Sequence, residues 1–131
     1  MLSVKKSMNE NLIGQLAKNS NRIVVTRGSE FNPKRKKDNA VIADIRDSDI
    51  VDNFAQTLKI DISHKADPGW MTWPEIYINF LENKTLKFSF GVLIDYWIRS
   101  SAWEGDYVLL NYKWFHEWLL ENEISYFKRD S

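Results

Sequence analysis

Residues 70–120, WMTWPEIYINFLENKTLKFSFGVLIDYWIRSSAWEGDYVLLNYKWFHEWLL, determine the fold of this chain. Apolar and polar side chains alternate from residue 75 to 81 and again from 85 to 90, which is the period of a half-buried strand. Only three polar residues separate the two runs, so the pattern predicts an antiparallel hairpin. The run LIDYWIR at 93–99 predicts a third strand, which completes a meander over about residues 75–99.

The sequence on either side predicts further strands of this sheet and helices that cover it. Apolar side chains recur at helical spacing in three segments, and Asp47 or Ser48 and Asn111 are suitable N-caps for the second and third. Runs of strands combined with such helices predict an α+β fold with an antiparallel sheet. The additional strands are expected at about residues 22–26 and 40–45, and the helices at about 7–18, 48–58 and 112–122.

The size and composition of the chain fit one globular domain, which we expect to span residues 1–131. Its 131 residues are 44% apolar and 27% charged, which is typical of a folded protein. The absence of cysteine excludes disulfides and every thiolate-based metal or nucleophile site.

The sequence favours a cytoplasmic location. The first residues, MLSVKKSMNENLIGQL, lack the continuous apolar core of about 7–15 residues that a signal peptide needs. No window approaches the roughly 18 apolar residues of a transmembrane helix. Zero cysteine also fits a reducing compartment.

Charge and aromatic residues are unevenly distributed, although the formal net charge is zero. Residues 1–65 carry 12 Lys and Arg against 8 Asp and Glu (+4), and residues 66–131 carry 6 against 10 (−4). Of the 18 aromatic residues, 16 lie at or beyond Trp70, including all 6 tryptophans. The acidic half is therefore also the aromatic half.

No ensemble of residues in the sequence amounts to an active site. The chain has no G-x-S-x-G nucleophile elbow, no Walker A loop and no G-x-G-x-x-G motif. Its two histidines, His64 and His116, lack a convergent set of partners. The D-x-x-H-x-x-D spacing from Asp61 to Asp67 does not converge in an extended segment or a turn. We expect no enzyme activity, no cofactor and no metal.

Tryptophans in predicted loops are the strongest functional candidates. Trp70 and Trp73 flank a turn before the first meander strand, and Trp103 lies in the loop SSAWEGD beside Glu104 and Asp106. Exposed indole rings with a charged rim are typical of protein interfaces. These five residues are the predicted partner-binding site, with Glu104 and Asp106 expected to be solvated loop carboxylates. The alternative is that the tryptophans form a satellite core at the open end of the sheet.

A basic run, KRKK, lies in a polar segment at 27–39 that we expect to be a mobile loop. Four consecutive cations can bind phosphates without sequence preference. Only Phe31 is nearby for base stacking, and the neutral total gives no extended basic stripe. A solvated loop is therefore the simpler interpretation, and the alternative is a nucleic-acid site formed by Lys34, Arg35, Lys36 and Lys37.

Residues 97–124 read WIRSSAWEGDYVLLNYKWFHEWLLENEI. A strand ending in Arg99, a Trp-x-x-Asp step, a leucine and an aromatic-rich helix together resemble a small bacterial α+β family whose members are mostly uncharacterised. The resemblance implies a fold element and no activity. In size, lack of a catalytic motif and aromatic–acidic character, the chain is also similar in type to immunity proteins that neutralise secreted bacterial toxins, although no motif carries that likeness.

We therefore expect a non-enzymatic protein-binding domain, and specifically an immunity-type inhibitor that docks on a toxin domain. An acidic face would suit a basic nuclease toxin and speed its capture. The alternative is a nucleic-acid-associated accessory protein that uses the basic loop. A homodimer is also possible if an apolar strand such as 85–90 lies at a sheet edge.

Overall fold

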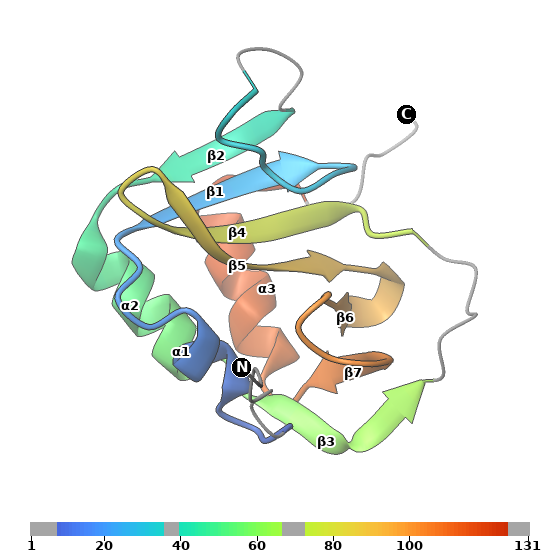
Figure 1. The fold of residues 1–131 in the computed structure, drawn as a ribbon. Coiled ribbons are helices and arrows are strands. Elements are labelled where there is room, and N and C mark those ends of the chain that lie inside the picture. The colour runs from blue at the N-terminus through green and yellow to red at the C-terminus, as the bar shows by residue number, and fades with distance from the viewer. Residues whose placement is uncertain (1–7, 36–39, 67–72, 126–131) are drawn as a thin grey trace, which may run out of the picture.

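The computed structural model describes residues 8–35, 40–66 and 73–125. In this part of the chain seven strands form one antiparallel sheet with the order β2-β1-β4-β5-β6-β7-β3 (Figure 1). The strands are β1 (Arg22–Arg27), β2 (Val41–Ile45), β3 (Ile60–Ala66), β4 (Ile76–Glu82), β5 (Thr85–Val92), β6 (Trp97–Arg99) and β7 (Asp106–Leu109). The helices are α1 (Leu12–Leu16), α2 (Ser48–Thr57) and α3 (Tyr112–Glu121), with a short 3₁₀ turn, η1 (Ile94–Tyr96).

The predicted α+β class and the central hairpin are confirmed. β4 pairs with β5 so that Ile78 lies opposite Phe90 and Phe80 lies opposite Phe88, which places the four apolar side chains on one face. The connection is a two-residue turn, with Glu82 paired to Thr85. Asn83 adopts φ 56°, a left-handed conformation that asparagine tolerates better than most residues.

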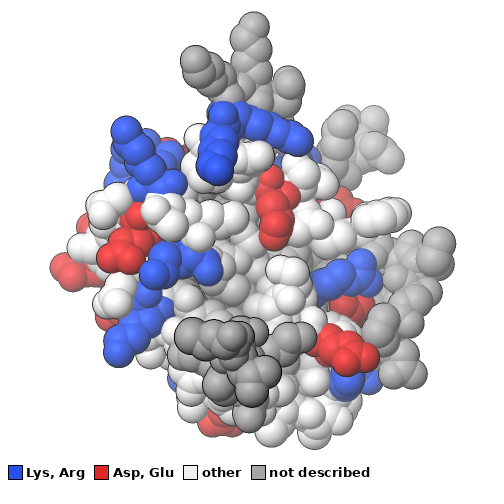
Figure 2. Space-filling view, in the orientation of Figure 1, with Lys and Arg blue, Asp and Glu red and all other residues white. Residues whose placement is uncertain are grey.

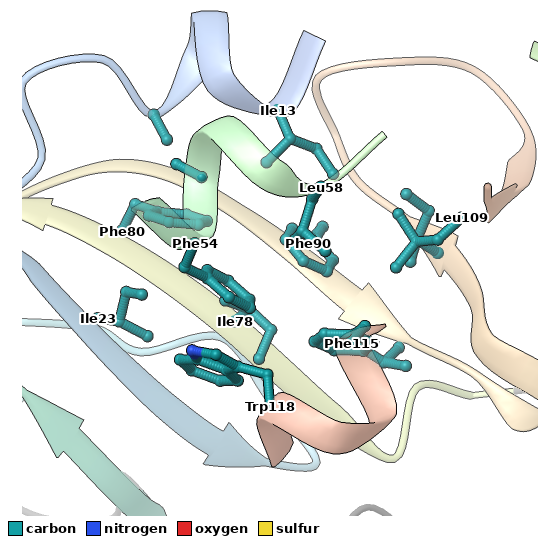
Figure 3. Packing of buried hydrophobic residues seen from close by; sticks show 14 of the residues in the cluster. Ile13, Ile23, Phe54, Leu58, Ile78, Phe80, Phe90, Leu109, Phe115 and Trp118 are labelled. Carbon is teal, nitrogen blue, oxygen red and sulfur yellow. The ribbon is translucent and has the colours of Figure 1, made fainter. Parts of the chain in front are cut away.

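One face of the sheet and the helices α2 and α3 enclose the core. The ring of Phe54 on α2 lies 3.9 Å from that of Trp118 and 5.9 Å from those of Phe80 and Phe115, measured between centroids (Figure 3). In the view of Figure 1, α3 passes behind β4 and β5. Burying each such aromatic side chain contributes about 1.5–3 kcal/mol to folding.

The opposite face of the sheet carries a buried polar network centred on Asn79. Its amide donates to the carbonyl of Val24 and to the hydroxyl of Thr26, and its Oδ1 accepts from Ser89 Oγ and from the backbone N–H of Phe31. Because buried polar groups are costly when unpaired, this set fixes the segment after β1 across the sheet (Figure 1). The predicted loop at 27–39 begins one residue later than expected, its residues 36–39 lie outside the described residues, and its mobility stays a prediction. β1 extends through Arg27, and the following residues are tied to the sheet as far as Phe31.

The predicted third strand at 93–99 is too long. Only Trp97–Arg99 forms β6, and the residues before it form η1, in which Asp95 and Tyr96 have φ values of 61° and 63°. β6 runs antiparallel to β5, with Val92 opposite Ile98, so the chain must reverse between these two residues. A continuous strand would leave no residues for that reversal.

The first predicted helix is also shorter than expected. α1 covers only Leu12–Leu16, against the prediction of about 7–18, of which residue 7 lies outside the described residues. The backbone N–H of Asn11 donates to Asn9 Oδ1, a local turn that competes with helical hydrogen bonds. The chain leaves the helical conformation at Asn19, where φ is 69°.

The outermost strands of the sheet are β2 and β3. β5 lies between β4 and β6, but its pairing with β6 covers only Gly91 and Val92, so pairing of two copies through residues 85–90 stays a prediction. Within the described residues, no helix is both long and apolar enough to cross a bilayer.

Candidate functional site

Trp73 is the most prominent exposed side chain. It exposes 80% of its surface, a larger fraction than any other large apolar residue in the described part of the chain. An indole ring left in water costs hydrophobic free energy that is recovered when a partner covers it.

The backbone that directly follows Trp73 is held against the sheet. The N–H of Glu75 donates to the carbonyl of Val92 over 2.8 Å. Pro74 lies so close to Gly91 that a Cβ added to this glycine would be only 2.6 Å from the Pro74 Cγ. Glycine at position 91 is therefore required for the approach of Pro74, and the pair positions Trp73 before any partner binds.

A row of paired residues leads from this point towards the predicted carboxylates. Gly91 is paired with Arg99, and Arg99 is paired with Asp106, on successive strands β5, β6 and β7. At about 4.8 Å per strand, Gly91 and Asp106 lie roughly 10 Å apart. Pro74, which contacts Gly91, therefore lies near one end of the row Gly91–Arg99–Asp106, and the loop that contains Glu104 lies near the other end.

Asp106 does not belong to an exposed acidic rim, so its predicted solvation is wrong. It exposes 1% of its surface. Its two carboxylate oxygens accept from Arg99 Nε and Nη2, each over 2.8 Å. Hydrogen bonding to this carboxylate raises the pKa of Arg99 above its ordinary value. A buried charge needs such a partner, and Asp106 therefore has a structural role.

Trp103 and Glu104 differ in their surroundings. The ring of Trp103 is partly buried and lies 5.9 Å from that of Phe88. Its buried indole N–H has no hydrogen-bond acceptor among the described residues. This placement fits the satellite-core alternative.

Glu104 is exposed. Trp70 lies outside the described residues. Trp73 and Glu104, the two predicted partner-binding residues that are exposed in the described part of the chain, are together called the anchor surface below.

Tyr77 lies beside this surface on β4, opposite Gly91. Burial raises the pKa of its hydroxyl, and the carboxylate of Glu30 adds to the rise while Arg99 opposes it. Tyr77 therefore stays neutral at physiological pH and keeps a proton to donate.

A second surface brings together cations from four separate segments. Two adjoining hollows of about 510 and 680 Å³ share Arg22 of β1 and Lys84 of the β4–β5 turn. The first is also lined by Arg46, which follows β2, and the second by Phe31 and Lys34 of the segment after β1. These five residues form what we call the basic cleft. Figure 2 shows Lys and Arg side chains gathered over the upper and left parts of this face.

Hydrogen bonds hold the walls of the basic cleft in place. The side chains of Asn21 and Asn83 bond to each other over 3.1 Å, and the N–H of Asn83 donates to Asn21 Oδ1 over 2.9 Å. These bonds fix the turn that presents Lys84. On the other wall, the N–H of Phe31 donates to Asn79 Oδ1 over 3.0 Å, and the Arg22 guanidinium lies 5.6 Å from the Phe31 ring centroid.

Asp44 is the carboxylate that balances the arginines of the cleft. Arg22 donates to both of its oxygens, over 2.9 and 2.8 Å, and Arg46 donates over 3.2 Å. The hydrogen bonds from Arg22, reinforced by Arg46, lower the pKa of Asp44 despite opposing desolvation. Neither Lys34 nor Lys84 forms an ion pair with a described residue.

We expect Asp44→Asn to destabilise the protein by about 0.5–1 kcal/mol at neutral pH, because the pair is partly solvated. The pKa of Asp44 is lower in the folded state than its unfolded value of about 3.9. The free energy that the ionised carboxylate contributes to folding is therefore fully present above about pH 3.9. This stabilising free energy is lost when the pH falls below the pKa of Asp44 in the folded state, because the carboxylate then becomes protonated. Urea unfolding of both proteins from about pH 7 to pH 2 checks this. A difference that grows on acidification would contradict it.

His64 is paired within its own strand. Its Nδ1 lies 2.8 Å from Asp61 Oδ2 on the edge strand β3, where the imidazole is exposed. Asp67, the third member of the spacing considered above, lies outside the described residues. Within those that the structure describes, no group of three potential ligands is placed to hold a metal ion.

The structure thus separates the predicted site residues. Trp73 and Glu104 remain available to a partner, whereas Asp106 is buried. Of the basic run, Lys34 and Arg35 are exposed, and Lys36 and Lys37 lie outside the described residues. The residues that sequence reasoning missed are Arg22, Arg46 and Lys84. They are isolated in the sequence, and only the pairing of β1 with both β2 and β4 brings them together.

Comparison of the chain with family models, with curated proteins and with solved structures finds no significant match in any of the three.

Proposed function

We propose that this chain is a non-enzymatic protein-binding domain that docks on its partner through the anchor surface. The observation that carries the proposal is the 80% exposure of Trp73 directly before Pro74 and Glu75, which are fixed against the sheet. Tryptophan is the residue type most enriched among interface hot spots, and pre-positioning reduces the entropy lost on binding.

The specific form that we propose is an immunity-type inhibitor that neutralises a bacterial toxin by direct contact. The support is the type of molecule: a small α+β domain without a catalytic ensemble in its sequence, with an acidic and aromatic C-terminal half. Glu104, which is exposed, would contact a basic partner favourably, and the acidic half would increase the rate of encounter.

Replacing Trp73 by alanine is expected to abolish partner binding without loss of stability. An exposed side chain contributes within about 0.5 kcal/mol to folding. A central anchor contributes at least about 2 kcal/mol to binding, which corresponds to a loss of roughly 30-fold or more in affinity. Affinity capture from the native host, with wild type and W73A as matched baits, measures this through the recovery of one stoichiometric partner.

The control is Ile50→Ala, which removes an exposed apolar side chain from α2 and should leave capture unchanged. A second variant, Gly91→Ala, leaves Trp73 intact but forces Pro74 away from β5, so it should also weaken capture. Equal capture by wild type and W73A would refute the anchor surface. Capture of no protein at all would refute the proposed function.

The toxin-inhibitor form has a separate test in growing cells. If a secreted-toxin gene lies next to the gene for this chain, the toxin domain should arrest growth, and co-expression of the wild-type chain should restore it. W73A should fail to protect although it is folded and equally abundant. Protection by W73A equal to that of wild type would contradict the assignment of Trp73.

A further inference from the structure

We propose that the basic cleft binds a short stretch of single-stranded nucleic acid, with phosphates at its cations and one base against Phe31. The cleft brings Arg22, Arg46, Lys34 and Lys84 around two adjoining hollows that share a wall. Asp44 balances one of these four charges, so three net positive charges remain. A partner must be anionic to cover this surface without leaving cations unpaired.

The lining is not only cationic, and this decides the class of anion. Phe31, Pro33 and Leu86 line the larger hollow between the cations. Phe31 is partly exposed, and Arg22 lies over its ring. Aromatic faces between phosphate-binding cations are the usual means of binding single strands without sequence preference. A duplex keeps its base faces stacked inside the helix and cannot use Phe31 in this way.

The cleft is built before any ligand arrives. The Asn21–Asn83 bonds hold the turn that carries Lys84, and Asn79 holds the backbone of Phe31. Lys34 and Lys84, which have no carboxylate partner among the described residues, are the cations that a phosphate would satisfy with the least competition. Arg35 follows Lys34 directly and extends the basic surface along the chain.

The site is independent of the anchor surface. Trp73 precedes the first residue of β4, whereas Lys84 follows its last, and a strand of this length spans roughly 20 Å. W73A should therefore bind oligonucleotides like wild type. Failure of the protein-docking proposal would leave this inference unaffected.

The test is fluorescence anisotropy with a labelled oligothymidine of about ten nucleotides, a length within the usual range for such sites. Between about 50 and 200 mM salt, contacts to two to four phosphates predict a slope of log affinity against log salt of roughly −1.4 to −2.8. The double variant K34E/K84E should lower affinity at least about 10-fold and flatten the slope by roughly 1.4.

The base contact has its own pair of variants. Phe31→Leu keeps the apolar volume but removes the aromatic face, so affinity should fall about 5-fold with an unchanged salt slope. Phe31→Trp should bind at least as well as wild type. The charge-matched control K65E/K113E changes one lysine on α3 and one on β3, which lies at the far edge of the sheet. This control should alter affinity less than about 2-fold at 100 mM salt.

Several results would overturn the proposal. They are no binding at millimolar protein, a salt-independent affinity, or equal affinities of K34E/K84E and the charge-matched control. Displacement of the oligonucleotide by polyglutamate at an equal number of charges would also overturn it, because the ligand would then be an acidic polypeptide. Circular dichroism of each variant shows that loss of binding is not loss of folding.

Discussion

Replacing Arg99 by methionine is expected to destabilise the protein by about 3–5 kcal/mol, because the change leaves the Asp106 carboxylate buried without its partner. Asp106 exposes 1% of its surface, and both of its oxygens bind Arg99. Methionine keeps much of the volume of the side chain but supplies no donor. Thermal unfolding should show Tm lowered by roughly 10–20 °C.

The double variant R99M/D106L distinguishes two quantities: the stability lost when a buried carboxylate is left unpaired, and the net stability that the ion pair contributes. When both charges are replaced by apolar groups of similar size, the cost should fall to about 1 kcal/mol or less. The coupling energy measured in the cycle is therefore large and favourable. A cost below about 1 kcal/mol for R99M alone would show that solvent reaches the carboxylate.

Replacing Phe54 by alanine is the second change with a large expected effect, about 3–5 kcal/mol of stability. Phe54 contacts Phe80 of the sheet and Phe115 and Trp118 of α3, so its ring joins three elements of the core. Removing the ring leaves a cavity that the surrounding rigid elements cannot fill by small shifts. Equilibrium unfolding in urea measures the loss.

Ile50→Ala on the same helix is the matched control for Phe54→Ala. Its side chain is exposed on α2, so the change should alter stability by less than about 0.5 kcal/mol. Because alanine is the best helix former, helix propensity cannot cause a loss in either variant. A similar loss for both variants would mean that Phe54 contributes no more to stability than an exposed side chain of α2. A loss below about 1 kcal/mol for Phe54→Ala would contradict its central place in the core.

The two surfaces proposed to bind partners depend on different features of the fold. The anchor surface depends on one exposed indole that directly precedes a fixed segment, so one substitution removes it. The basic cleft is assembled from four segments, so we expect its proposed affinity for nucleic acid to decline gradually as cations are removed. Because the two surfaces lie at opposite ends of β4, each can be altered while the other remains as a control.

The parts of the fold that local periodicity encodes were predictable. The alternation in residues 75–90 predicts the β4–β5 hairpin, and the helical spacing of apolar residues in 48–58 and 112–122 predicts α2 and α3 nearly to their ends. Asp47 caps α2 as expected, accepting from the N–H groups of Asp49 and Ile50. Each of these signals is a relation between neighbours in the chain.

Periodicity could not predict where the chain reverses or which loop residues are buried. The run at 93–99 looks like one strand, but the pairing of β6 with β5 requires a turn within it. Trp73 and Trp103 look equivalent in the sequence, yet one is exposed and the other packs on Phe88. Burial depends on residues distant in the chain, and these contacts leave no local pattern.

The sequence by itself determined the class of fold, the central hairpin, the two long helices and the tryptophan-rich character of the second half, because each follows from residue types at fixed spacing. Only the tertiary structure decided that Asp106 is a buried partner of Arg99, that Trp73 is the exposed one among the described tryptophans, and that Arg22, Arg46 and Lys84 form one cleft. The physical reason is that strand order is set by which apolar faces pack together across the whole sheet. That order brings side chains from separate segments into contact.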